Sequence, residues 1–120
     1  MASYSSRLIE AVRPDGTGRH TLFPFVPGGE QQHPDWSADG RRLVFSVVGT
    51  ATQTIWVGDA DGSNTSLLVD CQLPCQWVGE PAWSPDSGLV AYQRMVSRDG
   101  VAVSTIETID PATRQERVVY

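Results

Sequence analysis

Two cysteines, Cys71 and Cys75, are the residues of this chain whose type and spacing first suggest chemistry. Three residues separate them, and Pro74 favours a turn that can bring their Cα atoms to the distance of about 5.5 Å that a disulfide needs. Two thiols alone do not make a zinc site, and neither His20 nor His33 is near them in the sequence. A disulfide and a pair of free thiols both stay open, and a disulfide would indicate an extracytoplasmic compartment.

Other motifs for catalysis or metal binding are weak. Neither histidine lies in a nucleophile motif such as G-x-S-x-G, and the chain has no lysine for a phosphate-binding loop. Asp59, Asp61, Gly62 and Asn64 have a faint likeness to a calcium loop, but a third acidic position before the glycine and a distal glutamate are absent. A hairpin turn explains these residues better. We therefore expect no catalytic residue, no metal and no cofactor.

The charge and hydropathy of the chain argue against other classes of function. Its 120 residues carry nine basic and fourteen acidic side chains, a net charge of −5, and all the basic residues are arginine. A nucleic-acid partner is not expected, because phosphate contacts need a basic face. The longest apolar runs, such as residues 43–45, are too short for a membrane span, and residues 1–7 lack the apolar core of a signal peptide.

An internal repeat of 46–47 residues organises the chain. Trp36 and Trp83 lie 47 positions apart in similar surroundings, and Phe45 and Tyr92 keep the same offset. A second pair of similar segments, 13–16 and 59–62, is offset by 46 positions, and a looser copy follows over 103–120. A period of this length is typical of repeat architectures such as propellers.

The segments between the turn signals are expected to be short strands. They are rich in Val, Ile, Thr and aromatic residues, and Asp-Gly, Pro-Asp or Pro-Ala pairs separate them. We expect a leading hairpin and two units of four strands, the second with a longer loop at 94–100. The expected strands are 35–37, 42–47, 54–58 and 66–70, followed by 82–84, 89–94, 103–109 and 115–120.

The repeated segments resemble the TolB-like β-propeller family. Residues 34–40 (PDWSADG) and 81–87 (PAWSPDS) are similar to its P-x-W-S-P-D-G signature, and residues 55–64 (IWVGDADGSN) are similar to its I-W-V-M-D-A-D-G-S-N hairpin. Ala38 replaces the usual proline, and Ser87 replaces the usual glycine, where we expect Gly88 to take over the turn. The resemblance extends from about Leu8 to Tyr120.

This resemblance implies an all-β fold of consecutive four-stranded antiparallel β-propeller blades, a partial propeller. Residues 1–32 would form the C-terminal hairpin of a first blade, 33–79 a second blade and 80–120 a third. Closed propellers generally need about 4–8 blades. These two and a half blades are therefore expected to be the remainder of a longer propeller or to form a homo-oligomer.

The motif residues are expected to have structural roles. The tryptophans and the aromatic residues that follow them would pack between blades, and the aspartates would accept backbone N–H bonds in turns that the serines brace. These structural residues are Trp36, Ser37, Asp39, Gly40, Phe45, Trp83, Ser84, Asp86 and Tyr92.

The resemblance also implies a function. TolB-like propellers are typically cell-envelope proteins that bind protein partners, so it implies a non-enzymatic interaction or scaffold segment with a protein or peptide partner. The location would be extracytoplasmic, in the periplasm or cell envelope, with the export signal absent from this chain. Trp77, on the loop that leads into the third blade, is a candidate partner contact, and packing over the blade edge is the alternative.

Two other functions stay open. Similar propellers cover the catalytic domain of prolyl-oligopeptidase-type serine peptidases, so the chain could belong to such a domain. It could also be a part-propeller that self-assembles into a closed ring.

Overall fold

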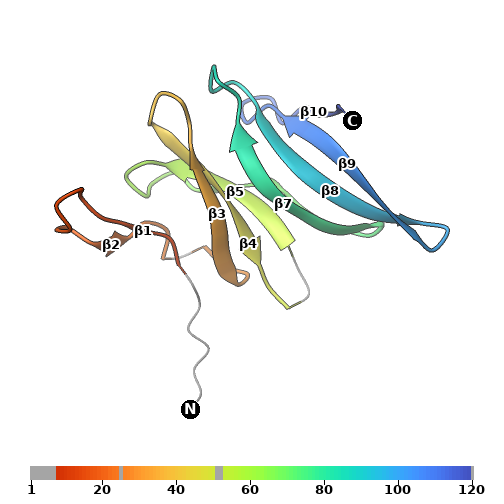
Figure 1. The fold of residues 1–120 in the computed structure, drawn as a ribbon, viewed down its shortest axis with the longest axis horizontal. Helices are drawn as coiled ribbons and strands as arrows, with labels where there is room; N and C mark the ends of the chain where they lie inside the picture. Colours follow the sequence, from red (N-terminus) through yellow and green to blue (C-terminus); the bar gives the residue numbers. More distant parts are fainter. Residues whose placement is uncertain (1–7, 25, 51–52, 120) are drawn as a thin grey trace, which may run out of the picture.

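The computed structural model describes residues 8–24, 26–50 and 53–119, which form an all-β structure (Figure 1). The described strands are β1 (Glu10–Ala11), β2 (His20–Thr21), β3 (Glu30–Trp36), β4 (Arg42–Val48), β5 (Gln53–Asp59), β6 (Ser66–Val69), β7 (Cys75–Trp83), β8 (Val90–Arg98), β9 (Val101–Ile109) and β10 (Glu116–Val118). In this described part of the chain, we find no helix with the length and apolar character needed to cross a membrane.

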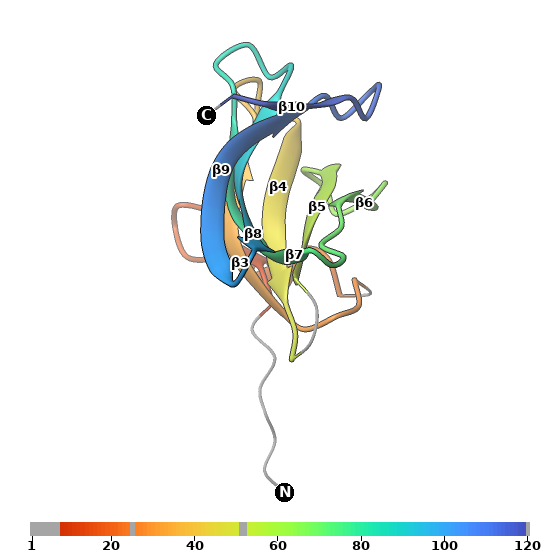
Figure 2. The ribbon, with the colours of Figure 1, turned by 90° about the vertical axis from the view of Figure 1, so that its right-hand side faces the viewer.

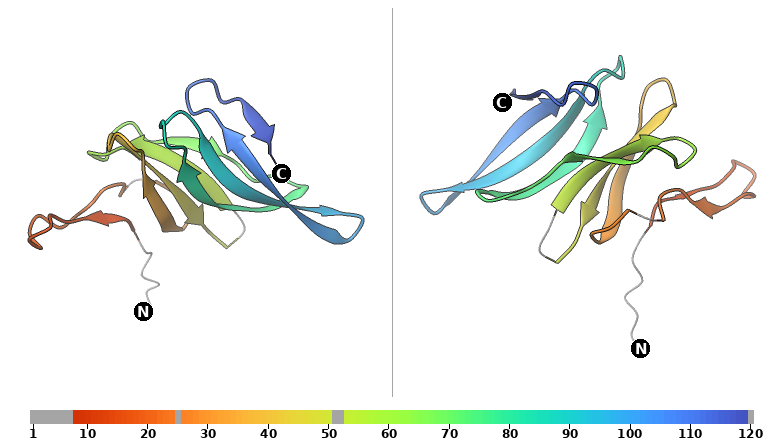
Figure 3. Two further views of the ribbon diagram at one scale, coloured as in Figure 1. Left: turned by 45° about the horizontal axis from the view of Figure 1, so that its top comes forward. Right: turned by 180° about the vertical axis from the view of Figure 1, so that it is seen from behind.

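The strands form one hairpin and two four-stranded antiparallel sheets. We call β1–β2 the first-blade hairpin, β3–β6 the second blade and β7–β10 the third blade. Within each blade the strands lie side by side in chain order, which is the arrangement of a propeller blade. The two blades pack face to face and do not close a ring (Figures 2 and 3). The structure thus confirms the expected all-β fold of consecutive four-stranded blades.

The strand contacts between the two blades centre on β7, the innermost strand of the third blade. The innermost strands, β3 and β7, contact each other, and β7 also lies against β4 and β5. Inside the second blade, β4 and β5 pair without interruption from Arg42–Asp59 to Val48–Gln53. The Asp-Gly turn after β5 needs its glycine: Gly62 has a φ of 91°, and a Cβ there would clash with the carbonyl oxygen of Leu22.

The innermost strands are longer than the sequence predicted. β3 and β7 begin well before residues 35 and 82, so the boundaries expected at 33 and 80 fall inside these strands. Each strand contains a β-bulge, between Gln32 and Asp35 in β3 and between Gly79 and Ala82 in β7, with a proline inside it. A bulge interrupts the two-residue alternation, and proline is tolerated in a strand only at an edge or a bulge. Because of the bulge and the proline, the sequence pattern does not indicate the full length of either strand.

The region 94–100, expected to be a long loop, is mostly strand. β8 continues to Arg98 and β9 begins at Val101, so Asp99 and Gly100 alone form the turn. Both turn residues have positive φ, 52° and 77°, as a two-residue hairpin turn requires. The outermost strands, in contrast, are shorter than expected.

Two hydrophobic clusters hold the structure together. One lies between the first-blade hairpin and the second blade, and contains Ile9, Leu22, Phe23, Leu43, Phe45 and Val47. The other lies between the second and third blades, and contains Val44, Ile55, Val57, Leu68, Val69, Cys75, Val78, Val90, Tyr92 and Ile109. Successive residues of β4 enter different clusters because side chains alternate across a strand. The second blade is therefore packed on both faces.

Candidate functional site

The turn after the innermost strand of the second blade is braced by a serine and an aspartate. The Ser37 hydroxyl donates to Asp39 Oδ1 at 2.6 Å and accepts the N–H of Arg42 at 3.0 Å. Asp39 Oδ1 also accepts the N–H of Arg41 at 3.0 Å. These hydrogen bonds hold the pKa of the Asp39 carboxyl below its ordinary value of 3.8, and the bond from the Ser37 hydroxyl has a larger effect than the bond from the Arg41 N–H. The geometry assigns both side chains to the turn.

The third blade repeats this brace with one change. Ser84 Oγ donates to Asp86 Oδ1 at 2.6 Å, and the Gly88 N–H donates to the same oxygen at 3.0 Å. Gly40 in the second blade has a φ of 71°, and Ser87, its equivalent, has a φ of 62°. The expectation that Gly88 takes over the turn is therefore wrong. The brace fixes the register of the turn, so Ser87 itself must adopt the left-handed backbone conformation.

Trp83 joins the third blade to the second. Its N–H donates to Asp35 Oδ2 at 2.8 Å, and its indole Nε1–H donates to the Asp35 carbonyl at 3.1 Å. The Arg42 guanidinium lies over the indole, 4.6 Å from the ring centroid, and donates to the Ser87 carbonyl at 3.2 Å. The motif tryptophan is thus held by hydrogen bonds and a cation–π contact as well as by packing.

Trp36, the equivalent tryptophan of the second blade, is 50% exposed. The expectation that both motif tryptophans are buried between blades is therefore wrong for Trp36. On its side of the second blade, the described residues provide only the first-blade hairpin, which has no counterpart of the strands that cover Trp83.

A second contact joins the blades at their outer rim. Arg114, in the turn between β9 and β10, reaches β6 of the second blade. Its guanidinium donates to the Leu67 carbonyl at 2.6 Å and to Ser66 Oγ at 3.1 Å. The two blades are therefore fixed to each other at the inner and the outer edge.

Phe45 anchors the first-blade hairpin to the second blade. It is fully buried, and its ring stacks on Phe23 with 4.7 Å between the ring centroids. Beside it, the buried amide of Gln31 accepts the N–H of Ile9 at 2.9 Å and donates to the Phe23 carbonyl at 2.9 Å. One side chain of β3 thereby satisfies backbone groups of the hairpin that would otherwise be buried without partners.

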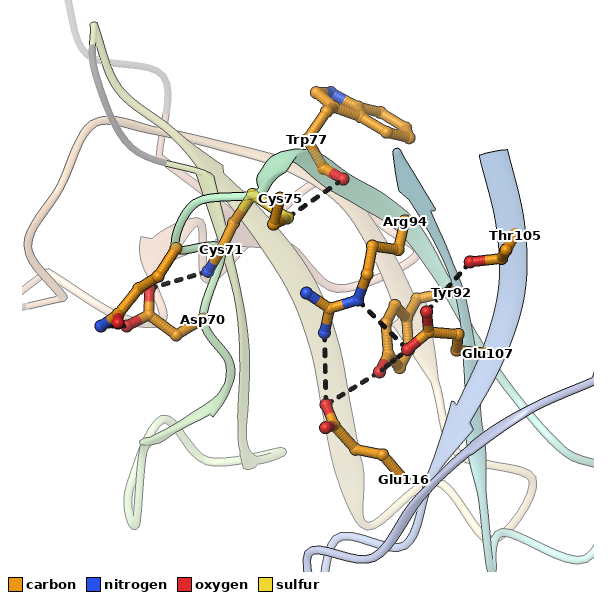
Figure 4. Close-up of a disulfide and its surroundings, with 10 residues drawn as sticks. Asp70, Cys71, Cys75, Trp77, Tyr92, Arg94, Thr105, Glu107 and Glu116 are labelled. Carbon is orange, nitrogen blue, oxygen red and sulfur yellow. Dashed lines mark hydrogen bonds and ion pairs between the residues drawn. A yellow bond between two sulfur atoms is a disulfide. The ribbon is translucent and has the colours of Figure 1, made fainter. Parts of the chain in front are cut away.

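Tyr92, the equivalent of Phe45, is buried but carries a polar network (Figure 4). Its hydroxyl lies 2.9 Å from a Glu116 carboxylate oxygen and 3.1 Å from a Glu107 carboxylate oxygen. Arg94 Nε donates to Glu107 at 3.1 Å, and Thr105 donates to the other Glu107 oxygen at 2.9 Å. Burial raises the pKa of the Tyr92 hydroxyl well above its ordinary value, so the hydroxyl keeps its proton and acts as a donor. These groups satisfy one another inside the third blade.

Cys71 and Cys75 form a disulfide at the connection between the second and third blades (Figure 4). Their Cα atoms are 5.2 Å apart, and Cys75 is the first residue of β7 and part of the core. The bond closes a short ring between β6 and the innermost strand of the next blade.

Trp77 lies on a strand, so its placement on a loop is wrong. It is the third residue of β7, and its indole covers Gly79 of the same strand, where a Cβ would lie 2.6 Å from the ring. The side chain is partly buried. The bulge and the proline in β7 interrupt its sequence pattern, so the strand begins earlier than predicted and includes Trp77.

Two exposed residues of the innermost strands, His33 and Glu80, were not selected by the motif analysis. They lie 47 positions apart on the innermost strands β3 and β7, each inside a bulge and each directly before a proline. Both have a φ of 54°, a conformation that residues other than glycine seldom adopt, and both are exposed. Bulges often redirect side chains at functional sites. The sequence signal that could have found them is the repeated X-Pro pair at the repeat offset.

A hollow of about 630 Å³ lies beside His33. Residues 8–10, which lead into β1, line one side of it, and residues 31–34 of β3 line the other. Within residues 8–24, 26–50 and 53–119, no cluster of three or more His, Cys, Asp or Glu side chains could hold a metal ion. The innermost strands and this hollow are therefore the candidate site, and they offer a surface for binding.

Comparison with known proteins supports this architecture. No protein-family model matches the chain. The chain is 29% identical over 100 residues to the Tol-Pal system protein TolB of Albidiferax ferrireducens, a match that covers 83% of this chain and 21% of that protein. The chain thus spans about a fifth of the length of the curated relative that it matches.

Solved structures share the fold at lower identity. TolB from Acinetobacter baumannii superposes with a TM-score of 0.68 and 18% identity, over 92% of this chain and 26% of that one. The β-propeller domain of the Trilobed protease from Pyrococcus furiosus superposes with a TM-score of 0.61 and 15% identity, over 92% of this chain and 33% of that one. Together with the repeated motifs and the blade architecture, these comparisons show that the chain is made of β-propeller blades similar to those of TolB.

Proposed function

We propose that the chain is a non-enzymatic propeller segment that binds a protein or peptide partner along its innermost strands. The observation that carries this proposal is the pair of bulges that present His33 and Glu80 at equivalent positions of neighbouring blades. An irregular, strained backbone that recurs with the repeat, and that points polar side chains outward, favours a recognition surface over a purely structural one. The sequence similarity to a Tol-Pal system protein supports the same function.

Site-specific photo-crosslinking tests this proposal. A benzophenone amino acid is placed at position 33, 80 or 117 of the protein in its host cell. Position 117 is the control, because Arg117 is exposed on the outermost strand β10. We expect the same discrete protein adduct from positions 33 and 80 and none from position 117. Equal adducts from all three positions, or no adduct from the inner pair, would contradict the proposal.

An extracytoplasmic location is part of the same proposal. It is supported by the disulfide between Cys71 and Cys75, since such bonds persist mainly in oxidising compartments. Thiol titration of the unfolded protein, isolated anaerobically without reductant or alkylating reagent, tests this. We expect no free thiol before reduction and two after it. Two free thiols before reduction would argue for a reducing compartment.

The second candidate function is that of a propeller domain in a serine peptidase. It is favoured by the fold similarity to the β-propeller domain of the Trilobed protease. A fluorophosphonate probe separates the two functions when it is applied to the natural protein in its host cell. Our proposal expects no labelled band that an antibody against this chain recognises. A labelled band of that kind would favour the peptidase.

A further inference from the structure

The third strand of the third blade, β9, is longer than the outer strand beside it. β10 pairs only with Glu107–Ile109, and the Val119 N–H donates to the Ile106 carbonyl. Residues 101–104 pair with β8 on one side and, within the described part of the chain, have no strand on the other. Figure 1 shows this stretch next to the β8–β9 turn, at the end of β9 away from β10. β9 therefore has an open edge over residues 101–104.

The open edge comes from an extension of the β8–β9 hairpin. Ile106 is equivalent to Ile55 of the second blade, because their partners Gln93 and Ser46 lie 47 positions apart. In the second blade the outer strand β6 also pairs no further than Ile55, and the chain then continues into β7. However, β5 begins two residues before Ile55, whereas β9 begins five residues before Ile106. The longer hairpin, and not a shorter outer strand, thus leaves the edge uncovered.

Backbone groups at every second residue of this stretch point away from β8. The Ile106 carbonyl faces the β10 side, since it accepts the Val119 N–H. Residues of an antiparallel strand bond to one neighbour at alternate positions. Ser104 and Ala102 therefore present their N–H and C=O groups on the open side, whereas Val101 and Val103 direct theirs to β8. The edge offers these groups to a further strand.

The other strand edges in the described part of the chain are protected against such pairing. The innermost strands β3 and β7 each carry a bulge and a proline, and Arg114 binds across β6. β1 and β2 have two residues each, and β10 has three, of which two are charged. Residues 101–106 (VAVSTI) contain no charge, proline or glycine and are mostly β-branched. Natural sheets blunt exposed edges with such devices, so an edge that lacks them is suited to binding a further strand.

We propose that a second copy of this chain pairs with this edge, β9 against β9, in an antiparallel arrangement with two-fold symmetry. Ala102 of each copy lies opposite Ser104 of the other, and each such pair exchanges its outward N–H···O=C bonds. Val103 of one copy then lies opposite Val103 of the other. The strands β7–β9 of both copies thereby form one continuous sheet.

Charge favours this edge as the place where two copies meet. The chain has a net charge of −5, so two copies repel each other over most of their surfaces. Pairing of residues 101–105 with themselves places no charged side chain on either strand, and like charges directly opposite each other would destabilise the pair. The two-fold arrangement also uses the outward backbone groups of Ala102 and Ser104 in both copies. A second copy is therefore complementary to the edge in charge and in hydrogen bonding.

Sedimentation equilibrium over a range of concentrations tests this inference. The edge variant combines Ala102→Lys with Ser104→Lys, two exposed positions that face each other across the proposed pair. The matched control combines Ala112→Lys with Thr113→Lys, which are exposed in the turn between β9 and β10. Both variants make the net charge less negative by the same amount, so general repulsion between copies falls equally in the two.

We expect the natural chain and the control variant to dimerise with the same dissociation constant. The edge variant should have a dissociation constant raised about tenfold or more, because lysine lies opposite lysine. Mixing it with a variant that combines Ala102→Glu and Ser104→Glu should restore dimers. A natural chain that stays monomeric up to about 1 mM, or a dimer that the edge lysines leave unchanged, would overturn the inference.

Amide hydrogen exchange of the natural chain is the second arm, which needs no variant to fold. The amides of Ala102 and Ser104 should become protected as the protein concentration rises. The amides of Val101 and Val103 are the internal reference, since their bonds to β8 do not depend on a second copy. Exchange at Ala102 and Ser104 that is independent of concentration refutes the inference.

A benzophenone amino acid at position 102, in the host cell, identifies what occupies the edge. We expect an adduct with the mass of two copies of the chain. An adduct of another mass would mean that a different protein occupies the edge, and the second copy would then be wrong. The edge lies on the third strand of its blade, away from His33 and Glu80 on the innermost strands, and Arg117 pairs with Thr108 at the other end of β9. This inference and the proposed function can therefore fail separately.

Discussion

Replacing Trp83 with alanine is expected to lower the free energy of unfolding by about 3 kcal/mol, the low end of the range for such substitutions, because the indole is only partly buried. The hydrogen bond from Nε1 to the Asp35 carbonyl accounts for about 1 kcal/mol. The contact with the Arg42 guanidinium accounts for about 0.5–1 kcal/mol. The apolar area that the ring removes from water accounts for the remaining 1–1.5 kcal/mol or so.

Trp36→Ala is the matched control, since it removes the same side chain from the same motif position. Trp36 is half exposed, so the expected loss is about 0.5 kcal/mol. Urea titrations followed by circular dichroism measure both losses, provided that the urea dependence of the unfolding free energy is the same in both variants. For a chain of 120 residues the unfolding entropy is about 0.25 kcal/mol/K, so the melting temperature should fall by about 12 °C for Trp83→Ala and about 2 °C for Trp36→Ala.

The comparison has clear outcomes that refute the reasoning. A loss below about 1 kcal/mol for Trp83→Ala would mean that this tryptophan does not hold the two blades together. Equal losses for the two variants would mean that the motif position, and not the neighbouring blade, sets the contribution. Trp83→Phe keeps an aromatic ring and removes the donor, and we expect it to lose about 1 kcal/mol.

Three further predictions concern the turns and the disulfide. Ser87→Gly should raise the free energy of unfolding by about 0.5–1 kcal/mol, because glycine adopts positive φ without a Cβ clash, and Gly40→Ser should lower it by a similar amount; urea titrations giving changes of the same sign would contradict this. Replacing Cys71 and Cys75 with serine should lower the free energy of unfolding by about 2 kcal/mol, the loop-entropy value for a ring of this size; excess reductant should destabilise the natural protein equally and leave the serine variant unchanged. Hydrogen bonds, of which that from the Ser84 hydroxyl is the largest cause, lower the pKa of Asp86 in the folded state, so the stability that this carboxylate contributes is present above its unfolded pKa and lost as the pH falls below about 4. Asp86→Asn should reduce that loss of stability in urea titrations between about pH 2 and 5. An unchanged loss would show that the carboxyl is not linked to folding.

The blade architecture is predictable from the sequence because the same local chemistry occurs twice at a fixed offset. Ser37 and Asp39 make the same turn bonds as Ser84 and Asp86, and a turn of this kind must join two adjacent antiparallel strands. The run of apolar residues after each turn, which includes valine and an aromatic residue, then predicts the second strand. These are local features, so they do not depend on which segment lies nearby in space.

The burial of the motif tryptophans is not predictable in this way. The motif is the same at Trp36 and Trp83, but the strands that contact Trp83 belong to the preceding blade, and the described residues give Trp36 no such strands. The network around Tyr92 is likewise hidden, because its contact with Glu107 depends on the register of β8 and β9. In the second blade a phenylalanine occupies the equivalent position, so the repeat gives no sign of a polar group there.

The contact of the Arg114 guanidinium with the second blade affects how cooperatively the two blades denature. In a linear repeat array, cooperativity depends on how strongly neighbouring units are coupled relative to the stability of each unit alone. Arg114 holds the last strand of one unit, Trp83 holds the first strand of the next, and the two contacts lie at opposite margins of the same interface. Neither margin can open while the other stays closed without bending a sheet, so the coupled pair of units should denature in a single transition.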